Sequence, residues 1–206
     1  EAPGFVQQFA QRRNQTELDD FQGLSPDQMH CFLYFPFESP QFVEFAEKLE
    51  QNLDVPVLTL FRLLAAEIPE KGLKPTAKGN LPRKVCRETA LEYLGEDGYR
   101  DLTLFGGINS EVDFIDLNVV RIVSEQAGLI RKYKGKFILG RKCRGYLAES
   151  RFDLIYIRLF RTYVETFGWE YRDPYLCCVL IQSGFLFSRY LLGSYGVKPR
   201  RQLVYV

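Results

Sequence analysis

Residues 117–147 read LNVVRIVSEQAGLIRKYKGKFILGRKCRGYL, and the residue pattern changes along this run. Apolar residues recur at helical spacing up to Ala127, and Gly128 is typical of the position just after a helix end. Two short strand-like runs follow, on either side of Lys134-Gly135, a dipeptide that favours a tight turn. We therefore predict a helix that ends at Gly128 and is followed by a β-hairpin.

Two further helical patterns precede this run. Pro56 begins an amphipathic helix, and Leu81-Pro82 begins a second helix that we expect to end at Gly95. Residues 73–76, between these helices, form a short extended segment in our interpretation. The order helix, strand, helix, helix, hairpin is that of a winged-helix unit, whose third helix keeps an outer face free. We predict a mainly α fold with a small β-hairpin, a winged-helix-like core extended by N- and C-terminal helices.

The pattern divides the chain into three regions, which we expect to pack as one compact unit. They are a helical arm over 1–55, a winged-helix-like unit over 56–150 and an aromatic helical region over 151–206. In the arm, Ser25-Pro26 and Ser39-Pro40 each indicate a helix start, because serine caps a helix and proline fits its first position. An insertion over 95–115 has a weak pattern, and we expect it to be partly helical and exposed.

Composition excludes several classes of protein. The 206 residues are 46% hydrophobic and 15% aromatic, which excludes a disordered chain. With 27 basic and 26 acidic residues the net charge is +1, so any attraction to nucleic acid or anionic lipid must be local. The most apolar stretch, residues 176–192, is short and interrupted by polar side chains. We expect no membrane partner.

The cysteines and the first residues of the sequence indicate a cellular compartment. Five cysteines are an odd number and share no CxxC spacing, which favours reduced thiols. The sequence begins at Glu1 with neither the basic nor the apolar region of a secretory signal. We therefore predict a cytoplasmic location.

The sharpest candidate site is a basic cluster interleaved with Tyr133 and Phe137. Cations on a hairpin can neutralise phosphates, and a tyrosine can pack on a sugar or a base. On the preceding helix we place Asn118 and Arg121 on the outer face as possible base-reading residues, beside Glu125, which repels phosphate. The alternative is a solvated hairpin, since lysines often protect edge strands. The cluster consists of Arg131, Lys132, Lys134, Lys136, Arg141, Lys142 and Arg144.

Signals for catalysis are weak, and we predict no cofactor. A single histidine leaves no obvious base or zinc site. Glu111, Asp113 and Asp116 could together hold a magnesium ion, although acidic residues also favour helix starts. The sequence leaves enzymatic activity open and favours a non-enzymatic role.

Three runs carry a resemblance to a known group of proteins. They are LSPDQMH at 24–30, TAKGNLPR at 76–83, and residues 127–139. Through them nearly the whole chain resembles a family of bacterial proteins that pair a winged-helix-like unit with an aromatic helical region. That family has no assigned reaction, so the resemblance implies the fold and a bacterial origin but no function. The insertion over 95–115 departs from winged-helix regulators.

Three hypotheses for function follow from these signals. The first is a non-enzymatic protein that binds DNA or RNA through the basic hairpin. The second is a protein-protein interaction or assembly module, in which the hairpin improves solubility or contacts an acidic partner. The weakest is a metal-dependent enzyme that uses the carboxylates of residues 111–116.

Overall fold

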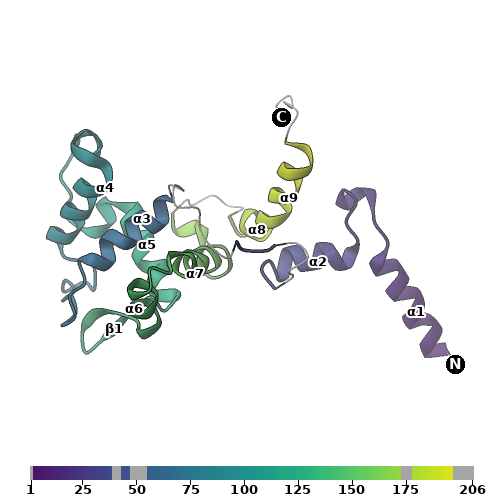
Figure 1. The fold of residues 1–206 in the computed structure, drawn as a ribbon. Helices are drawn as coiled ribbons and strands as arrows, with labels where there is room; N and C mark the ends of the chain where they lie inside the picture. The colour runs from purple at the N-terminus through teal and green to yellow at the C-terminus, as the bar shows by residue number, and fades with distance from the viewer. Residues whose placement is uncertain (1, 39–42, 47–54, 173–177, 197–206) are drawn as a thin grey trace. The chain divides into compact units, whose positions relative to one another are not determined.

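The computed structural model describes residues 2–38, 43–46, 55–172 and 178–196. These residues are mainly helical, with one two-stranded antiparallel sheet (Figure 1). The chain forms two compact units. The terminal unit consists of Glu1–Glu44 and Asp173–Val206, and the central unit of Phe45–Arg172.

The terminal unit contains the helices of both chain ends. Ser25 begins its second helix as predicted, because its hydroxyl accepts a hydrogen bond from the Gln28 amide at 3.3 Å, and the Gln28 side chain accepts one from the Ser25 amide at 2.8 Å. The Phe32 and Tyr190 rings lie 5.7 Å apart. The predicted start at Ser39-Pro40 lies outside the described residues. The elements are α1 (Ala2–Gln15), η1 (Asp19–Phe21), α2 (Pro26–Tyr34), α8 (Cys178–Ser183) and α9 (Phe185–Tyr195).

The central unit is built around α5, against which α3, α7, β1 and η2 all pack. Phe61, Leu117 and Leu159 are fully buried in the shared core. α7 belongs to the central unit, because it buries its apolar face in this core. The elements are α3 (Pro56–Ala66), α4 (Arg83–Thr103), η2 (Glu111–Asp113), α5 (Ile115–Gln126), β1 (Ile130–Tyr133), β2 (Lys136–Leu139), α6 (Arg141–Ala148), α7 (Phe152–Glu165) and η3 (Trp169–Tyr171).

The insertion over 95–115 is more ordered than its sequence predicts. Gly95 has a φ of 68°, which interrupts the helical geometry, yet α4 continues beyond it to Thr103. The expectation of an exposed insertion is wrong for its second half, because Ile108, Glu111 and Phe114 are buried. This half of the insertion belongs to the core and contacts α5 through η2.

The hairpin forms at the predicted place. Ile130 pairs with Leu139 at its base, and the turn residues Lys134 and Gly135 both have positive φ, 47° and 72°. Leu73 adds a third, single-residue strand, since its amide donates to the Phe137 carbonyl at 2.9 Å and its carbonyl accepts from the Phe137 amide at 2.8 Å. The extended segment between α3 and α4 therefore lies along β2.

The buried thiols of the central unit are poor nucleophiles. Burial raises the pKa of Cys86 to about 12, with a further contribution from the charge of Glu111. Burial also raises the pKa of Cys143 to about 11, an effect that Arg144 partly offsets. Both thiols are free and protonated at neutral pH, as expected of cysteines that serve packing.

Within the described residues, every helix is too short or too polar to cross a membrane.

Candidate nucleic-acid interface

The outer face of the hairpin presents an aromatic ring among cations. Side chains alternate along a strand, so Arg131 and Tyr133 share one face, and the register places Ile138 and Lys136 opposite them. Tyr133 is 57% exposed. Lys134 lies in the turn, with its Nζ 5.4 Å from the centre of the Tyr133 ring. The exposed tyrosine is therefore surrounded by three basic side chains.

Lys132 lies on the other face of the hairpin and is anchored to the core. Its Nζ lies 5.2 Å from the centre of the buried Phe137 ring and 3.7 Å from Oε2 of Glu125 on α5. In contrast, Arg131, Lys134 and Lys136 form no ion pair with any other residue that the structure describes. Those three charges remain available to a ligand.

The segment between α3 and α4 brings further cations to the hairpin. The Nζ of Lys136 donates a hydrogen bond to the Lys71 carbonyl at 3.0 Å. A Cβ atom on Gly79 would lie 3.9 Å from Nζ of Lys132. We call the combined surface the wing surface. It consists of Lys71, Lys74, Lys78, Arg131, Lys132, Lys134 and Lys136.

Sequence analysis missed the three lysines of this segment as site residues. Lys71, Lys74 and Lys78 lie far from the hairpin in sequence and form no motif with it. The usable signal was the extended segment predicted over residues 73–76, since a short extended segment can hydrogen-bond to the open edge of a hairpin. That pairing is the contact that Leu73 makes with Phe137.

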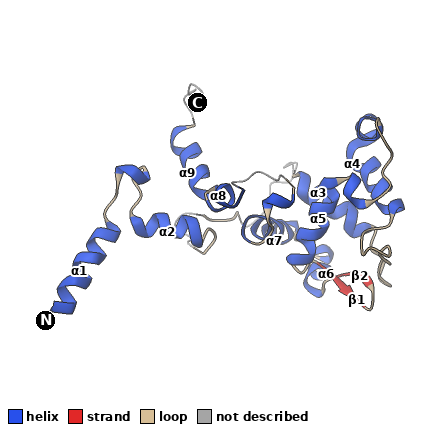
Figure 2. Cartoon of the chain, turned by 180° about the vertical axis from the view of Figure 1, so that it is seen from behind, coloured by secondary structure: helices blue, strands red, loops and turns tan. Residues whose placement is uncertain are grey.

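Three predicted members of the basic cluster are not on the hairpin. Arg141, Lys142 and Arg144 lie in α6, which begins directly after β2 (Figure 2). The hairpin closes at Gly140, whose amide donates to the Leu129 carbonyl at 2.8 Å, and the chain then turns into a helix. All three side chains are exposed around the buried Cys143. The predicted basic cluster is thus divided between the hairpin, which carries four of its residues, and α6, which carries three.

The expected base-reading face of α5 does not exist. Asn118 and Arg121 were predicted on its outer face, but only 1% and 8% of their surfaces are exposed. The reason is that η2 and β1 pack on α5 in addition to α3 and α7, so little of the helix remains open. Neither residue can reach a nucleic-acid base from this position.

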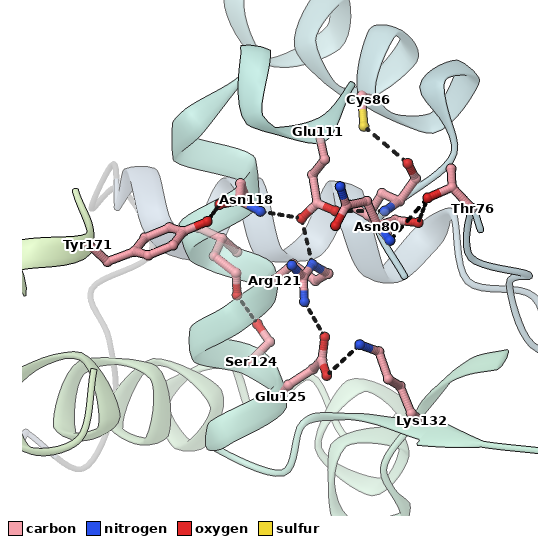
Figure 3. Close-up of polar contacts among 12 residues, drawn as sticks. Thr76, Asn80, Cys86, Glu111, Asn118, Arg121, Ser124, Glu125, Lys132 and Tyr171 are labelled. Atoms are coloured by element: carbon pink, nitrogen blue, oxygen red, sulfur yellow. Dashed lines mark hydrogen bonds and ion pairs between the residues drawn. The ribbon is translucent and has the colours of Figure 1, made fainter. Parts of the chain in front are cut away.

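Both residues instead surround a buried carboxylate. Glu111 is fully buried and accepts hydrogen bonds from the Leu81 amide at 2.6 Å, from Nδ2 of Asn118 at 2.8 Å and from Nε of Arg121 at 2.5 Å (Figure 3). The hydroxyl of Tyr171 donates to Oδ1 of Asn118 at 2.8 Å. A buried charge is tolerated when it is paired and hydrogen-bonded, and Glu111 meets both conditions.

The same network extends outward to the hairpin. Arg121 also pairs with Glu125 through Nη1, and Glu125 in turn contacts Lys132 (Figure 3). Burial alone would lower the pKa of the Arg121 guanidinium, but its bonds to Glu111 and Glu125 outweigh burial and raise that pKa. Alternating charges therefore connect the insertion, α5 and the wing surface. We call this set the buried polar network: Glu111, Asn118, Arg121, Glu125, Lys132 and Tyr171.

The three carboxylates considered for magnesium have separate protein partners. Glu111 binds inside the network, whereas Asp113 accepts hydrogen bonds from the amides of Asn109 at 2.9 Å and Ser110 at 2.8 Å. Asp116 pairs with Arg172 at 2.8 Å. Within the described part of the chain, no three His, Cys, Asp or Glu side chains lie together as metal ligands. This arrangement offers no support to metal-dependent catalysis.

Comparison with protein-family models, with curated proteins and with solved structures finds no match.

Proposed function

We propose that this chain is a non-enzymatic, winged-helix-like protein that binds nucleic acid through the wing surface. The order α3, paired Leu73, α4, α5 and hairpin supports a winged-helix unit. One observation supports binding most strongly. The exposed Tyr133 ring lies among Arg131, Lys134 and Lys136, which form no ion pair with another described residue.

The proposed contact is with the backbone rather than with base edges. Lysines and arginines neutralise phosphates and release counterions, a contribution that carries no sequence information. An exposed tyrosine can stack on a base of any identity. Since Asn118 and Arg121 are buried, the two residues predicted to read bases are not available to do so. We therefore expect weak sequence preference and a steep dependence on salt.

The test is fluorescence anisotropy with short duplex DNA, single-stranded DNA and RNA at several salt concentrations. The variant carries Arg131→Glu, Lys134→Glu and Lys136→Glu. Its matched control carries Arg12→Glu, Arg13→Glu and Arg100→Glu, three exposed positions on α1 and α4 that give the same change in net charge. We expect the control to bind like the native protein and the wing variant to lose binding.

Two results would contradict the proposal. One is equal loss of binding in both variants, because it would show that only total charge matters. The other is no binding of any of the three probes by the native protein at low salt, where phosphate contacts are strongest.

A second candidate function, protein interaction, is favoured by apolar side chains on the terminal unit. Phe5 and Phe9 of α1 are 73% and 61% exposed, and Val179 and Leu180 of α8 are 71% and 74% exposed. Exposed apolar groups of this kind often mark contact surfaces. Analytical ultracentrifugation of the native protein and of a Val179→Ser, Leu180→Ser variant tests self-association. A concentration-dependent oligomer that the variant loses would support this function.

A further inference from the structure

The central unit contains a cavity between α3, α5 and α7. Its volume is about 400 Å³, which lies in the range of small-molecule pockets, roughly 300–1,000 Å³. Half of the lining residues are aliphatic, and all of these except Val57 are buried, so the interior would accept an apolar group. This part of the lining consists of Val57, Leu60, Val119, Val120, Val123 and Leu159.

One side of the cavity is polar. Asp116 and Arg172 both line it, with Oδ1 of Asp116 lying 2.8 Å from Nη2 of Arg172. Oδ1 is buried and accepts no well-aligned hydrogen bond from a described residue. The side chains of Arg172 and Asp116 are 48% and 41% exposed, so both charged groups reach water to a similar extent. What distinguishes Asp116 is Oδ1, a buried oxygen of the cavity lining that lacks a well-aligned donor among the described residues.

This buried oxygen selects the charge of a ligand, because it can accept a hydrogen bond from an ammonium group but not from a carboxylate. A bound carboxylate would pair with Arg172 and leave its own negative charge close to that of Asp116. This repulsion is costly where water is partly excluded. A bound ammonium group would instead pair with Asp116, and the half-exposed side chain of Arg172 would turn into water. We propose that the cavity binds a small organic amine, with its ammonium group on Asp116 and its apolar body against the valines of α5.

The aromatic part of the lining supports the same choice. Tyr93, Phe160 and Tyr163 line the cavity together with Asp116. The faces of aromatic rings attract cations, and the attraction increases when the cation is partly desolvated. The proposal concerns the central unit alone and does not depend on nucleic-acid binding.

The test compares three probes of similar shape: 2-phenylethylamine, 2-phenylethanol and 3-phenylpropionate. Trp169 is the only tryptophan of the chain and lies 5.5 Å from the ring of Tyr163, so its fluorescence reports on the cavity. Calorimetric titration gives the affinities independently. We expect the amine to bind about tenfold more tightly than the alcohol, and the carboxylate to bind weakest.

Two variants test whether the ammonium group binds to Asp116. Asp116→Asn keeps the shape and is expected to remove the preference for the amine while leaving binding of the alcohol unchanged. Arg172→Gln is expected to strengthen binding of the amine, because it removes the competing cation. Unfolding curves establish that both variants fold, and if Asp116→Asn does not, the order of the three probes on the native protein still decides.

Several results would overturn the proposal. They are tightest binding of the carboxylate, equal binding of all three probes, no binding of any probe, and amine binding that a folded Asp116→Asn variant retains in full.

Discussion

The polar residues of α5 and the basic residues of the hairpin look alike in sequence but have opposite surroundings. Arg121 is buried and bonded to two carboxylates. Lys134 is exposed, and its Nζ lies 5.4 Å from the centre of the Tyr133 ring. A polar residue on a helix next to a basic hairpin can therefore be buried and serve the fold instead of binding a ligand.

The insertion accounts for this difference. It contributes Glu111, which is buried against α5 and requires a cation and further donors nearby. Arg121 and Asn118 supply these, so both serve the fold. On the hairpin, by contrast, Arg131, Lys134 and Lys136 are exposed to water. The predictions below contrast the two regions, beginning with the largest expected effect.

Removing the buried cation should destabilise the protein most. Arg121→Met would leave the Glu111 carboxylate buried without its ion-pair partner, and we expect a loss of about 3–5 kcal/mol in the free energy of unfolding. The double variant Glu111→Gln, Arg121→Met should recover part of this loss, because no buried charge remains. Urea unfolding measures the free energy of unfolding of the single and the double variant.

The matched change on the wing surface should have almost no effect on stability. Lys134→Met removes an exposed charge that pairs with no described carboxylate, and we expect a change below about 0.5 kcal/mol. Equal losses for Lys134→Met and Arg121→Met would contradict the distinction between the two regions.

Within the buried polar network, replacing Asn118 should cause the second-largest loss in the free energy of unfolding. Asn118→Leu removes a donor to Glu111 and the acceptor of the Tyr171 hydroxyl, and we expect a loss of about 1–3 kcal/mol. Thermal unfolding provides the measurement. A variant as stable as the native protein would show that the other hydrogen-bond partners of Glu111 stabilise the buried carboxylate without Asn118.

Tyr171→Phe should have a smaller effect, since it deletes only one hydroxyl from a half-exposed side chain. We expect a loss of about 0.5–1.5 kcal/mol, and little further loss when it is combined with Asn118→Leu. A double-mutant cycle in urea measures this coupling, and additive losses would contradict the bond between the two residues.

The amides of Asn109 and Ser110 hold the pKa of Asp113 below its ordinary value of 3.8. A lowered pKa in the folded state stabilises the protein above pH 3.8, and this contribution is lost as the pH falls through the folded pKa. Unfolding between about pH 2 and pH 6 should therefore show a weaker acid dependence in Asp113→Asn than in the native protein. An identical pH dependence would contradict a role for this carboxylate.

Local signals predicted the parts of the structure that depend on a few neighbouring residues. Ser25 and Gln28 form their cap, and Lys134-Gly135 forms its turn, because each conformation depends on residues close in sequence. The start of α6 was missed because its first residues continue the basic pattern of the hairpin.

Burial of the candidate site could not be predicted in the same way. The amphipathic pattern of α5 identifies one apolar face, but η2 covers a further part of the helix. The insertion has no clear periodicity, so nothing in its sequence indicates that Glu111 is buried against Arg121. Contacts between distant segments of weak pattern decide which polar residues remain exposed.

The most direct test of the central claim is the salt dependence of duplex DNA binding for the native protein and for Lys134→Gln and Lys136→Gln. If these lysines contact phosphates, the slope of log affinity against log salt should fall by about one for each variant. The slope should stay unchanged in Arg100→Gln, an exposed arginine of α4 that pairs with Asp97 outside the wing surface. A native slope near zero, or equal slopes in all four proteins, would contradict phosphate binding by the hairpin.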